Sequence, residues 1–591
     1  MEMLIKEVSK LLEEIGIEKP REKFEIPPNE KFGDLAFPCF DLAKKEKKSP
    51  NEIAKEIASK IKKTELIEKI ETVSGYINFF FNWSKVAEFF LKQIVEKKLK
   101  LEKVYGKKIM IEHTSVNPNK ALHIGHIRNA CLGDSLRRLF EFLGEDIIVA
   151  NYIDDTGAQM ADIILAFKFL NFPLKTEKKF DEYCGEIYVK INEMYKENPE
   201  LKEKRKFILK EIEKGNSEIA KFNDEIVERV VKDQLKTLWR LGIFYDLLNK
   251  ESDIIRLKFW EKAFSQLKEK NLVYLCKEGD KKGCWLLRLS LLPEFKDLKN
   301  PDITLVRSDG TVLYVGKDIA YAMWKHGLLK EDFLYKKFIT QPNGKILWST
   351  THENGEKEHP IFNNVDISIN VIDVRQSHEQ NAVVSSLKLI SEEKKQYIHY
   401  AYEVVSLSKE TANKLGLKVN ERFIHMSGRK GLFINADTIL DALFKKAYEE
   451  TKKRNPKESE KFWRSVAEKI AIAALRYELE KISPEKMIIF DMDKALRLEE
   501  NTGPYLQYTY TRCSGILRKV EKLEFNFSKE TLEDEEKKLI KLLIQFPTII
   551  KNAAKDLRIN YICNYAYELS KVFNKFYEKY PVLKLSLIHI S

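Results

Sequence analysis

Cysteine is scarce in this chain of 591 residues and follows no recognisable pattern. The seven cysteines are scattered, and none forms a Cys-x-x-Cys pair. An odd, scattered set is not a disulfide framework, and it lacks the paired spacing of a structural zinc cluster. We therefore expect reduced thiols, a cytoplasmic location and no zinc.

Long hydrophobic runs are also missing. No apolar stretch is long enough to cross a membrane. The residues from Met1 to Glu7 mix charged and apolar side chains at helical spacing, so they do not form the apolar core of a signal peptide. Internal repeats are absent, and low-complexity sequence is limited to lysine-rich stretches. We expect no contact with a membrane.

The length and charge set broad limits on the protein. A chain of 591 residues is too long for one hydrophobic core, so three or more domains are expected. Lys and Arg number 103 against 91 Asp and Glu, a formal net charge of +12. This excess suits a polyanionic partner, although lysines spread over solvated surfaces would produce the same excess.

The pattern of apolar residues predicts an α/β multidomain protein. The first 100 or so residues combine helical patterns with a strand-like run, Tyr76–Phe81. A buried strand at Lys108–Glu112 leads into a helix from His123 to Leu143 and a second strand at Ile147–Ala150. Strand, helix, strand in this order predicts a Rossmann-type parallel sheet that binds a nucleotide.

Downstream of this unit the pattern changes twice. From Met160 to Leu241 the chain is helical and charged, which indicates an insertion between two halves of the sheet. Strand-like runs return at 283–289, 312–315 and 367–372, and from about Asp437 onward helices dominate. We therefore predict an N-terminal α+β domain, a central parallel-sheet catalytic domain with a helical insertion, and a C-terminal all-α bundle.

The strongest chemical motif is His123-Ile124-Gly125-His126, which stands just after a strand and opens a helix. The two histidines lie on one face of the first helical turn, and Gly125 lets a nucleotide approach the backbone. The N–H groups at the start of the helix add a positive dipole end. Together these groups can stabilise charge that develops on a phosphate. Two histidines at the start of an ordinary helix are the plainer alternative, and the βαβ context argues against it.

These residues resemble a known family. His-Ile-Gly-His is the first signature of the class I aminoacyl-tRNA synthetases, and the wider sequence resembles their arginine-specific branch. The similar segments occur in the same order along nearly the whole chain, from about residue 25 to residue 583. They include 112–123, Arg128-Asn129-Ala130, Gly133-Asp134, 151–159, Leu241-Gly242-Ile243, Glu251-Ser252, 307–311 and 314–321.

The second class I signature is a loop, normally Lys-Met-Ser-Lys, that closes on ATP. The corresponding stretch here runs from His425 to Gly431, and it departs from the pattern because His425 and Gly428 replace the two lysines. In arginyl enzymes a lysine just before the first signature is thought to replace the second one, and Lys120 has that place. The resemblance implies ATP binding by the first signature, His123, Gly125 and His126, and by loop residues Met426, Ser427, Arg429 and Lys430. It implies catalytic roles for His123, His126 and Lys120.

The resemblance also implies an arginine site. Arginine ends in a planar cation with five donors, which carboxylates and carbonyls recognise. The family binds its amino acid at the positions of Glu112, Asn117, Tyr314, Asp318 and Gln376. We expect Asp318 to pair with the guanidinium, Tyr314 to flank it, and Glu112 and Asn117 to hold the α-ammonium and carboxylate. Ordinary surface ion pairs are the plainer alternative for each.

The terminal regions resemble the tRNA-binding parts of the family. The run 501–512 resembles a helical anticodon-binding bundle, in which Tyr505 and Tyr508 can stack on bases and Arg512 can meet phosphate. An aromatic stripe in a helix core is the alternative. The N-terminal segment, with Phe32-Gly33-Asp34, resembles the domain that contacts the tRNA elbow.

The end of the chain departs from the family. After Leu583 the family continues through closing helices, whereas this chain ends Leu585-Ser586-Leu587-Ile588-His589-Ile590-Ser591, which resembles a translated sequencing adapter. We expect a truncated reading frame. The expected domains are 1–100 for tRNA contact, 101–436 for catalysis, 437–584 for an incomplete anticodon bundle, and 585–591 for an adapter scar.

The resemblance implies an arginine–tRNA ligase that forms arginyl-adenylate from L-arginine and ATP and transfers it to tRNA(Arg). Its cofactor would be Mg²⁺ carried by ATP, with no metal held by the protein, and we expect a monomer. Two alternatives remain at this point. One is a cysteinyl enzyme, because it shares the bundle, and the other is a tRNA-binding paralogue without catalysis, which the His425 substitution and the short tail would suit.

Overall fold

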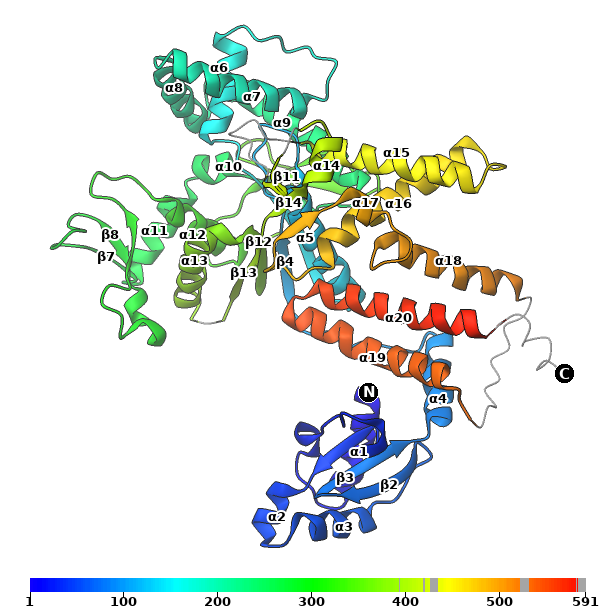
Figure 1. The fold of residues 1–591 in the computed structure, drawn as a ribbon. Helices are drawn as coiled ribbons and strands as arrows, with labels where there is room; N and C mark the ends of the chain where they lie inside the picture. Colours follow the sequence, from blue (N-terminus) through cyan, green and yellow to red (C-terminus); the bar gives the residue numbers. More distant parts are fainter. Residues whose placement is uncertain (393, 418–419, 426–433, 521–530, 581, 583–591) are drawn as a thin grey trace. The chain divides into compact units, whose positions relative to one another are not determined.

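The computed structural model describes residues 1–392, 394–417, 420–425, 434–520, 531–580 and 582. It forms two compact units (Figure 1). The sheet unit comprises residues 103–505 and 556–560, and the terminal unit comprises residues 1–102, 506–555 and the segment that begins at 561. Residues 585–591, which we predicted to be an adapter scar, lie outside the described residues.

A seven-stranded sheet is the centre of the sheet unit, in the order β10-β11-β6-β5-β4-β12-β13. All neighbouring strands run parallel except β10 and β11. The segment β6-β5-β4-β12-β13 has the order of a doubly wound nucleotide-binding sheet, in which connections reverse direction between β4 and β12. The strands are β4 (Lys108–Glu112), β5 (Asp146–Ile153), β6 (Leu247–Lys250), β10 (Leu334–Thr340), β11 (Ile346–Thr351), β12 (Ile367–Asp373) and β13 (Gln396–Tyr402).

The predicted βαβ unit and helical insertion are both confirmed. Helix α5 (Ile124–Phe142) connects β4 to β5, and four helices separate β5 from β6. Apolar residues of these helices, such as Ile163, Ile187 and Ile226, share one buried core with α5. The insertion helices are α6 (Ala158–Phe169), α7 (Phe180–Glu197), α8 (Leu201–Lys214) and α9 (Glu218–Arg240).

Two small sheets and further helices complete the sheet unit. The predicted strand within 283–289 is β8, the centre of a sheet of β7, β8 and β9. A second sheet contains β14, β15 and β16. The strands are β7 (Val273–Leu275), β8 (Trp285–Leu287), β9 (Ile303–Val306), β14 (Val405–Ser408), β15 (Phe423–His425) and β16 (Ile488–Phe490). The helices are α10 (Glu251–Arg256), α11 (Phe259–Glu269), α12 (Tyr314–Lys325), α13 (Ser377–Ile390), α14 (Lys409–Lys414), α15 (Ala436–Arg454), α16 (Glu460–Glu480) and α17 (Met492–Ala495).

The strand predicted at 312–315 is wrong. Helix α12 begins at Tyr314, and Val312 makes only an isolated bridge to Val306. The apolar residues of this run continue downstream at helical spacing, since Val315, Ile319 and Ala322 all pack in buried clusters. The β-branched and aromatic residues there are therefore the end of a loop and the first turn of a helix.

Helices α15 and α16 belong to the sheet unit. The α16 residue Arg476 reaches α5, where its Nη1 lies 2.9 Å from the fully buried Asp134 carboxylate. We predicted these helices as part of the anticodon domain. The boundary at 437 stays a prediction, and the geometry shows that the helices after it pack on the nucleotide-binding core.

The terminal unit joins both ends of the chain. Its antiparallel sheet has the order β1-β3-β2, and the predicted strand Tyr76–Phe81 is β3. Ile540 and Ile544 of α19 enter the core beneath this sheet, and Lys541 Nζ lies 3.1 Å from Asp34. The elements are α1 (Glu2–Glu14), β1 (Leu35–Pro38), α2 (Phe40–Glu46), α3 (Pro50–Lys60), β2 (Ile67–Val73), β3 (Tyr76–Phe81), α4 (Trp83–Val95) and most of α18 (Gly503–Lys519), α19 (Asp534–Asp556) and α20 (Ile559–Lys579).

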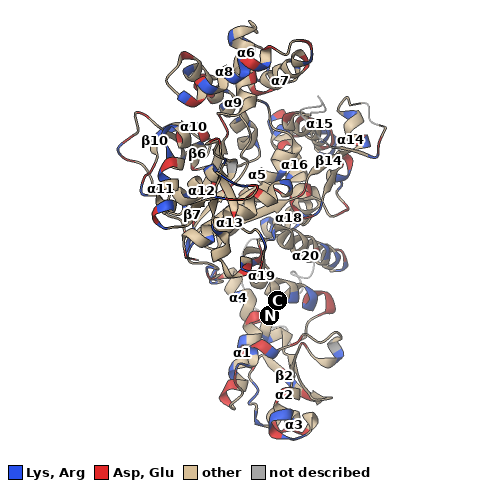
Figure 2. Ribbon diagram, turned by 90° about the vertical axis from the view of Figure 1, so that its left-hand side faces the viewer, with Lys and Arg blue, Asp and Glu red and all other residues tan. Residues whose placement is uncertain are grey.

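Charged residues of both signs occur throughout both units. Lysine and arginine positions are interspersed with aspartate and glutamate positions along the ribbon (Figure 2). Within the described ranges, no helix combines the length and hydropathy needed to cross a membrane.

Candidate active site

A cavity of about 680 Å³ lies where β4 and β12 end, at the point where the sheet connections reverse. Ligands of open α/β sheets bind at this position because the loops after the strands diverge there. The cavity contains most of the predicted ATP and arginine residues. Its wall includes Glu112, Asn117, His123, Gly125, His126, Asp318 and Gln376.

The turn that follows β4 has a strained backbone. Thr114 and Ser115 both have positive φ, 75° and 45°, and the β-branched Thr114 rarely adopts such an angle. Asn129 Oδ1 accepts the Thr114 N–H at 2.5 Å, and Asn151 Oδ1 accepts the Ser115 N–H at 2.9 Å. These two asparagines hold the turn against the cavity. Sequence analysis included both in the family resemblance without assigning them a role.

The first signature forms a capping box made of histidines. His123 is the N-cap of α5, and its Nδ1 accepts the N–H groups of Gly125 and His126 at 3.1 and 3.3 Å. His126 Nδ1 in turn accepts the His123 N–H at 3.2 Å. Because both Nδ1 atoms accept, each neutral ring carries its proton on Nε2. The rings stack with centroids 3.5 Å apart.

Both histidines stay neutral at physiological pH. Burial, together with the nearby positive charge of Lys120, lowers the pKa of His123 to about 3. Burial and then the neighbouring His123 and Lys120 lower the pKa of His126 well below its usual value. Lys120 does not line the cavity, but its charge acts on both rings. Arg375, which sequence analysis missed, lines the cavity and is held by Asp373 at 2.8 Å.

The ends of the second signature loop are tied to known elements. Before the loop, β15 pairs with β14, and Ser406 faces His425. After the loop, Asn435 forms an antiparallel bridge with His123, and the Ala436 N–H donates to the Leu122 carbonyl at 2.8 Å. The backbone therefore brings the end of one signature to the start of the other. The predicted ATP ligands Met426, Ser427, Arg429 and Lys430 lie outside the described residues.

Asp318 is the cavity carboxylate with no partner. It lies on α12, and among the residues that the structure describes no side chain forms a hydrogen bond or ion pair with it. Burial, followed by the negative charge of Glu251, raises the pKa of Asp318 to about 7. Tyr314 begins the same helix one turn earlier, and its side chain is not among those described. A cationic ligand would satisfy this carboxylate.

Glu112 and Asn117 have different partners. Glu112 Oε1 lies 2.9 Å from Lys325 Nζ, and its Oε2 accepts the Tyr321 hydroxyl at 2.6 Å, so it belongs to the α12 wall. Asn117 donates instead to Asp154 at 2.7 Å. Burial, and then Glu251, raises the pKa of Asp154 to about 7. The two residues that we assigned together to the amino-acid backbone thus contact different elements, α12 for Glu112 and the segment after β5 for Asn117.

Several lining residues were not predicted. Tyr321 lies one helical turn after Asp318, and this spacing is the signal that could have identified it. Tyr152 of β5 lies in the segment 151–159, which resembles the family but received no role. Nothing in the local sequence marks Tyr397 and Tyr402 of β13. The additional polar and aromatic residues of the wall are Thr114, Ser115, Asn129, Tyr152, Asp154, Tyr321, Asp373, Arg375, Gln380, Tyr397 and Tyr402.

The predicted tRNA residues lie on α18. Tyr505 is half-buried and belongs to the sheet unit. In the terminal unit, Tyr508 is 42% exposed and the Arg512 guanidinium carbon lies 4.4 Å from the centroid of its ring. Arg512 also donates to Asn574 at 2.8 Å. The neighbouring Tyr510, which sequence analysis did not select, is 74% exposed.

Comparisons with known proteins agree with this arrangement. Residues 90–337 match the description "tRNA synthetases class I (R), catalytic domain", residues 506–586 match "DALR anticodon binding domain", and residues 2–81 match "Arginyl tRNA synthetase N terminal domain". An arginine–tRNA ligase of Thermococcus sibiricus is 39% identical and covers 99% of this chain and 93% of its own length. One of Pyrococcus abyssi is 38% identical, with coverages of 95% and 90%.

A solved structure extends the similarity to three dimensions. The arginyl-tRNA synthetase of Thermus thermophilus superposes with a TM-score of 0.80 at 30% identity, covering 98% of this chain and 91% of that protein. With a relative 39% identical over almost its whole length, the chain belongs to the arginyl-tRNA synthetase family of class I tRNA synthetases.

Proposed function

We propose that this chain activates L-arginine with ATP and transfers it to tRNA(Arg). The observation that carries the proposal is one cavity that holds both the histidine-capped start of α5 and the carboxylate of Asp318, which has no partner among the described residues. The first suits a nucleoside triphosphate, and the second suits a guanidinium. Membership of the arginine branch argues against the cysteinyl alternative.

In the activation step the arginine carboxylate attacks the α-phosphate of ATP, and pyrophosphate leaves. The Nε2–H groups of His123 and His126 and the N–H groups of the first turn of α5 donate to the phosphate oxygens. Gly125 leaves room for the nucleotide because it has no side chain. These groups are preorganised, so positioning and electrostatics supply the rate enhancement.

The signature loop and Lys120 complete the ATP site. We propose that Met426, Ser427, Arg429 and Lys430 bind the triphosphate. Lys120 supplies the positive charge that the second lysine of the usual loop would provide. Magnesium enters with ATP as part of the substrate and neutralises phosphate charge. Among the described residues no group of three or more His, Cys, Asp and Glu could hold a metal ion. We propose that arginine is selected without zinc.

Arginine selection rests on charge and fit. Asp318 pairs with the guanidinium, Tyr314 flanks it, and Glu112 lies on the same wall. Asn117 and Gln376 remain for the α-ammonium and carboxylate. Lysine lacks the planar fork and citrulline lacks the charge, so either would leave buried groups unpaired. This argues that no editing step is needed.

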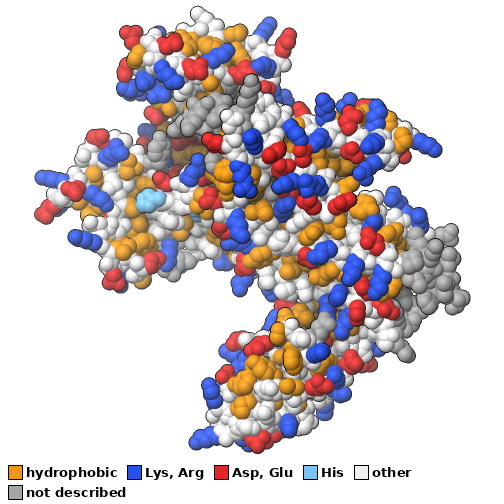
Figure 3. Space-filling model, viewed as in Figure 1, with side chains coloured by type: hydrophobic (Ala, Val, Ile, Leu, Met, Phe, Trp, Pro, Cys, Tyr) orange, Lys and Arg blue, Asp and Glu red, His pale blue; other side chains and the backbone are white. Residues whose placement is uncertain are grey.

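Transfer and tRNA binding involve both units. The 2′-hydroxyl of the terminal tRNA adenosine attacks the carbonyl carbon of arginyl-adenylate and AMP leaves, as membership of class I implies. We propose anticodon contacts for Tyr505, Tyr508 and Arg512, and elbow contacts for the N-terminal domain. Apolar side chains gather on that domain in Figure 3, and Ile26, Phe32, Phe40 and Val73 are exposed there. We keep the domain limits 1–100, 101–436 and 437–584, and propose a cytoplasmic monomer.

Arginine-dependent exchange between ATP and pyrophosphate, measured with and without tRNA, tests the proposal. We expect exchange that requires arginine and tRNA, because members of the family typically need tRNA before they activate arginine. Lysine and citrulline should give none. Tight tRNA binding with no exchange in either arm would refute the proposal and identify a binding paralogue.

A further inference from the structure

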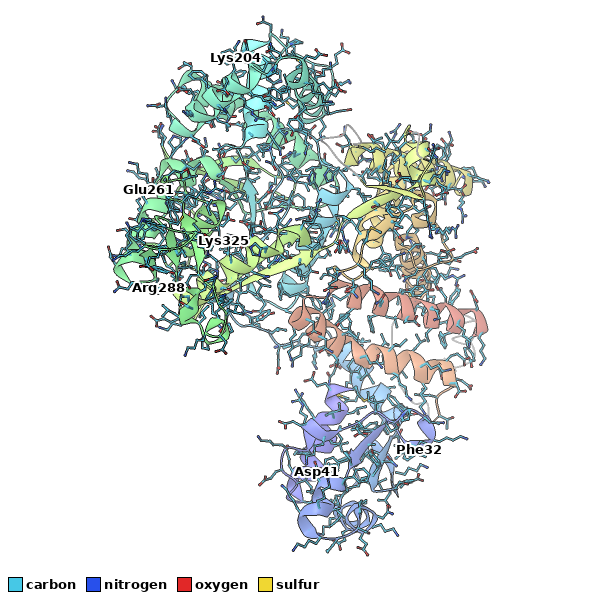
Figure 4. The ribbon with its side chains drawn as sticks, turned by 60° about the vertical axis from the view of Figure 1, so that its left-hand side comes forward. Phe32, Asp41, Lys204, Glu261, Arg288 and Lys325 are labelled. Atoms are coloured by element: carbon cyan, nitrogen blue, oxygen red, sulfur yellow. The ribbon has the colours of Figure 1, made fainter. Side chains whose placement is uncertain are left out.

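Lys325 is a fully buried cation at the base of the arginine wall. It is 1% exposed, and its Nζ lies 2.9 Å from Glu112 Oε1 and 2.7 Å from Asn370 Oδ1. The same ammonium lies 4.3 Å from the centroid of the Tyr321 ring. Figure 4 places Lys325 inside the sheet unit, whereas Lys204, Glu261 and Arg288 lie toward its periphery.

The burial of the Lys325 ammonium group requires a functional or structural explanation. Burying an ammonium is costly, and an apolar residue of similar volume often stabilises a fold as well as an ion pair does. Lys325 is also placed by its helix, because Asp318, Tyr321 and Lys325 recur at the spacing of one face of α12. Lys325 and Tyr321 touch Glu112, and the third side chain is Asp318, which has no partner within the part of the chain that the structure describes.

The charges fit this arrangement. Lys325 supplies a positive charge directly against the enclosed Glu112 carboxylate, in a cavity that Asp154 and Asp318 also line.

We infer that Lys325 is a positioning residue for arginine, which holds the Glu112 carboxylate in a fixed orientation so that it and Asp318 receive one guanidinium together. Lys325 and Tyr321 each occupy one oxygen of Glu112, and each oxygen keeps a second lone pair for a substrate N–H. The inference rests on the proposed function, since it names how that function selects its amino acid.

Lys325→Met and Lys325→Arg test the inference by ATP–pyrophosphate exchange with tRNA. We expect Lys325→Met to raise the KM for arginine at least about tenfold and to leave the KM for ATP within about twofold, because only the arginine wall is disturbed. Lys325→Arg keeps the charge and should recover part of the loss. Lys108→Met is the matched control, since Lys108 lies on the same strand as Glu112 but binds carbonyls of 361 and 363 at its other end. It should leave both KM values unchanged.

The double variant Lys325→Met with Glu112→Gln separates positioning from burial. Removing both charges should restore thermal stability, because no buried charge is left unpaired. The KM for arginine should stay high, because the second carboxylate is gone. Recovery of the arginine KM along with stability would overturn the inference and make the pair merely structural.

Tyr321→Phe is a second test of the inference, which remains available if the Lys325→Met variant does not fold. It removes only the hydroxyl that fixes Glu112 Oε2, and it should raise the KM for arginine severalfold at unchanged melting temperature. An unchanged arginine KM in this variant would also overturn the inference. A wild-type chain with no arginine-dependent exchange would instead refute the proposed function, so the two failures are distinguishable.

Discussion

The imidazole rings of His123 and His126 stack 3.5 Å apart while each ring accepts a backbone N–H of the other residue. This reciprocal cap fixes both rings before any ligand arrives. It also fixes their tautomers, because an Nδ1 that accepts leaves the proton on Nε2. The first turn of α5 therefore presents neutral donors to a phosphate, rather than imidazolium cations.

Replacing His126 with alanine should remove one of these donors and disturb the other. We expect adenylate formation to fall by about 10²- to 10³-fold, the usual cost of losing a preorganised donor to a developing oxyanion. Affinity for tRNA should stay within about twofold, since the anticodon residues are elsewhere in the chain. Single-turnover adenylate formation and tRNA filter binding measure the two effects, and near-normal turnover would rule out the proposed role.

The pKa of Asp318 predicts how arginine affinity depends on pH. Because burial raises the pKa of Asp318 to about 7, the carboxyl is protonated below that pH and cannot pair with a guanidinium. The KM for arginine should be flat above pH 7 and rise about tenfold per pH unit below it. Asp154 titrates near the same pH, so Asp318→Asn is the control. That variant should have a high KM at every pH and a shallower slope.

The same carboxyl should limit stability at alkaline pH. A group whose pKa is raised by folding stabilises the fold when protonated, and this contribution is lost as pH rises through about 7. Asp318→Asn should therefore raise the free energy of unfolding at pH 8 by about 1 to 2 kcal/mol, with a smaller difference at pH 5. Urea unfolding without arginine measures both values. A variant less stable than wild type at pH 8 would contradict the assignment.

The sequence was sufficient for the parts of the site that depend on local order. The apolar strand Lys108–Glu112, the glycine in the signature and the following helix predicted where β4 ends and α5 begins. The position of the cavity at the strand ends followed from the parallel sheet. These features depend on residues that are close together in the sequence, and the spacing of apolar residues predicts structure of this local kind.

The parts that depend on long-range packing could not be predicted. Glu112 and Lys325 form an ion pair although more than two hundred residues separate them in the sequence. No pattern in the sequence around either residue predicts this pair. The strand predicted at 312–315 failed because local β propensity there was outweighed by helical packing further along. The partners of Glu112 and Asn117 likewise emerged only from the three-dimensional arrangement.

Gly133 allows α5 to pack closely on the end of β4. A Cβ added there would lie 2.3 Å from His113 Cγ, and His113 is fully buried against Tyr245. Gly133→Ala should therefore lower the free energy of unfolding by about 1 to 3 kcal/mol. Gly515→Ala is the matched control, because Gly515 is also helical and a Cβ there meets no atom within 4 Å. It should stabilise α18 slightly. If thermal melts showed the same loss of stability for both variants, the packing argument would be contradicted.

Tyr508 is the anticodon residue whose role is easiest to isolate. It is 42% exposed, and Arg512 beside its ring is also held by Asn574, so removal of the ring should leave Arg512 in place. Tyr508→Ala should weaken tRNA(Arg) binding about tenfold, because stacking on a base contributes about 1 to 3 kcal/mol. Tyr508→Phe keeps the ring and should bind normally. Tyr510→Ala is the comparison variant, since Tyr510 is 74% exposed and two residues along the helix, on a different face. If filter binding showed equal losses for both alanine variants, exposed aromatic surface in general, rather than the face of Tyr508 and Arg512, would account for tRNA binding.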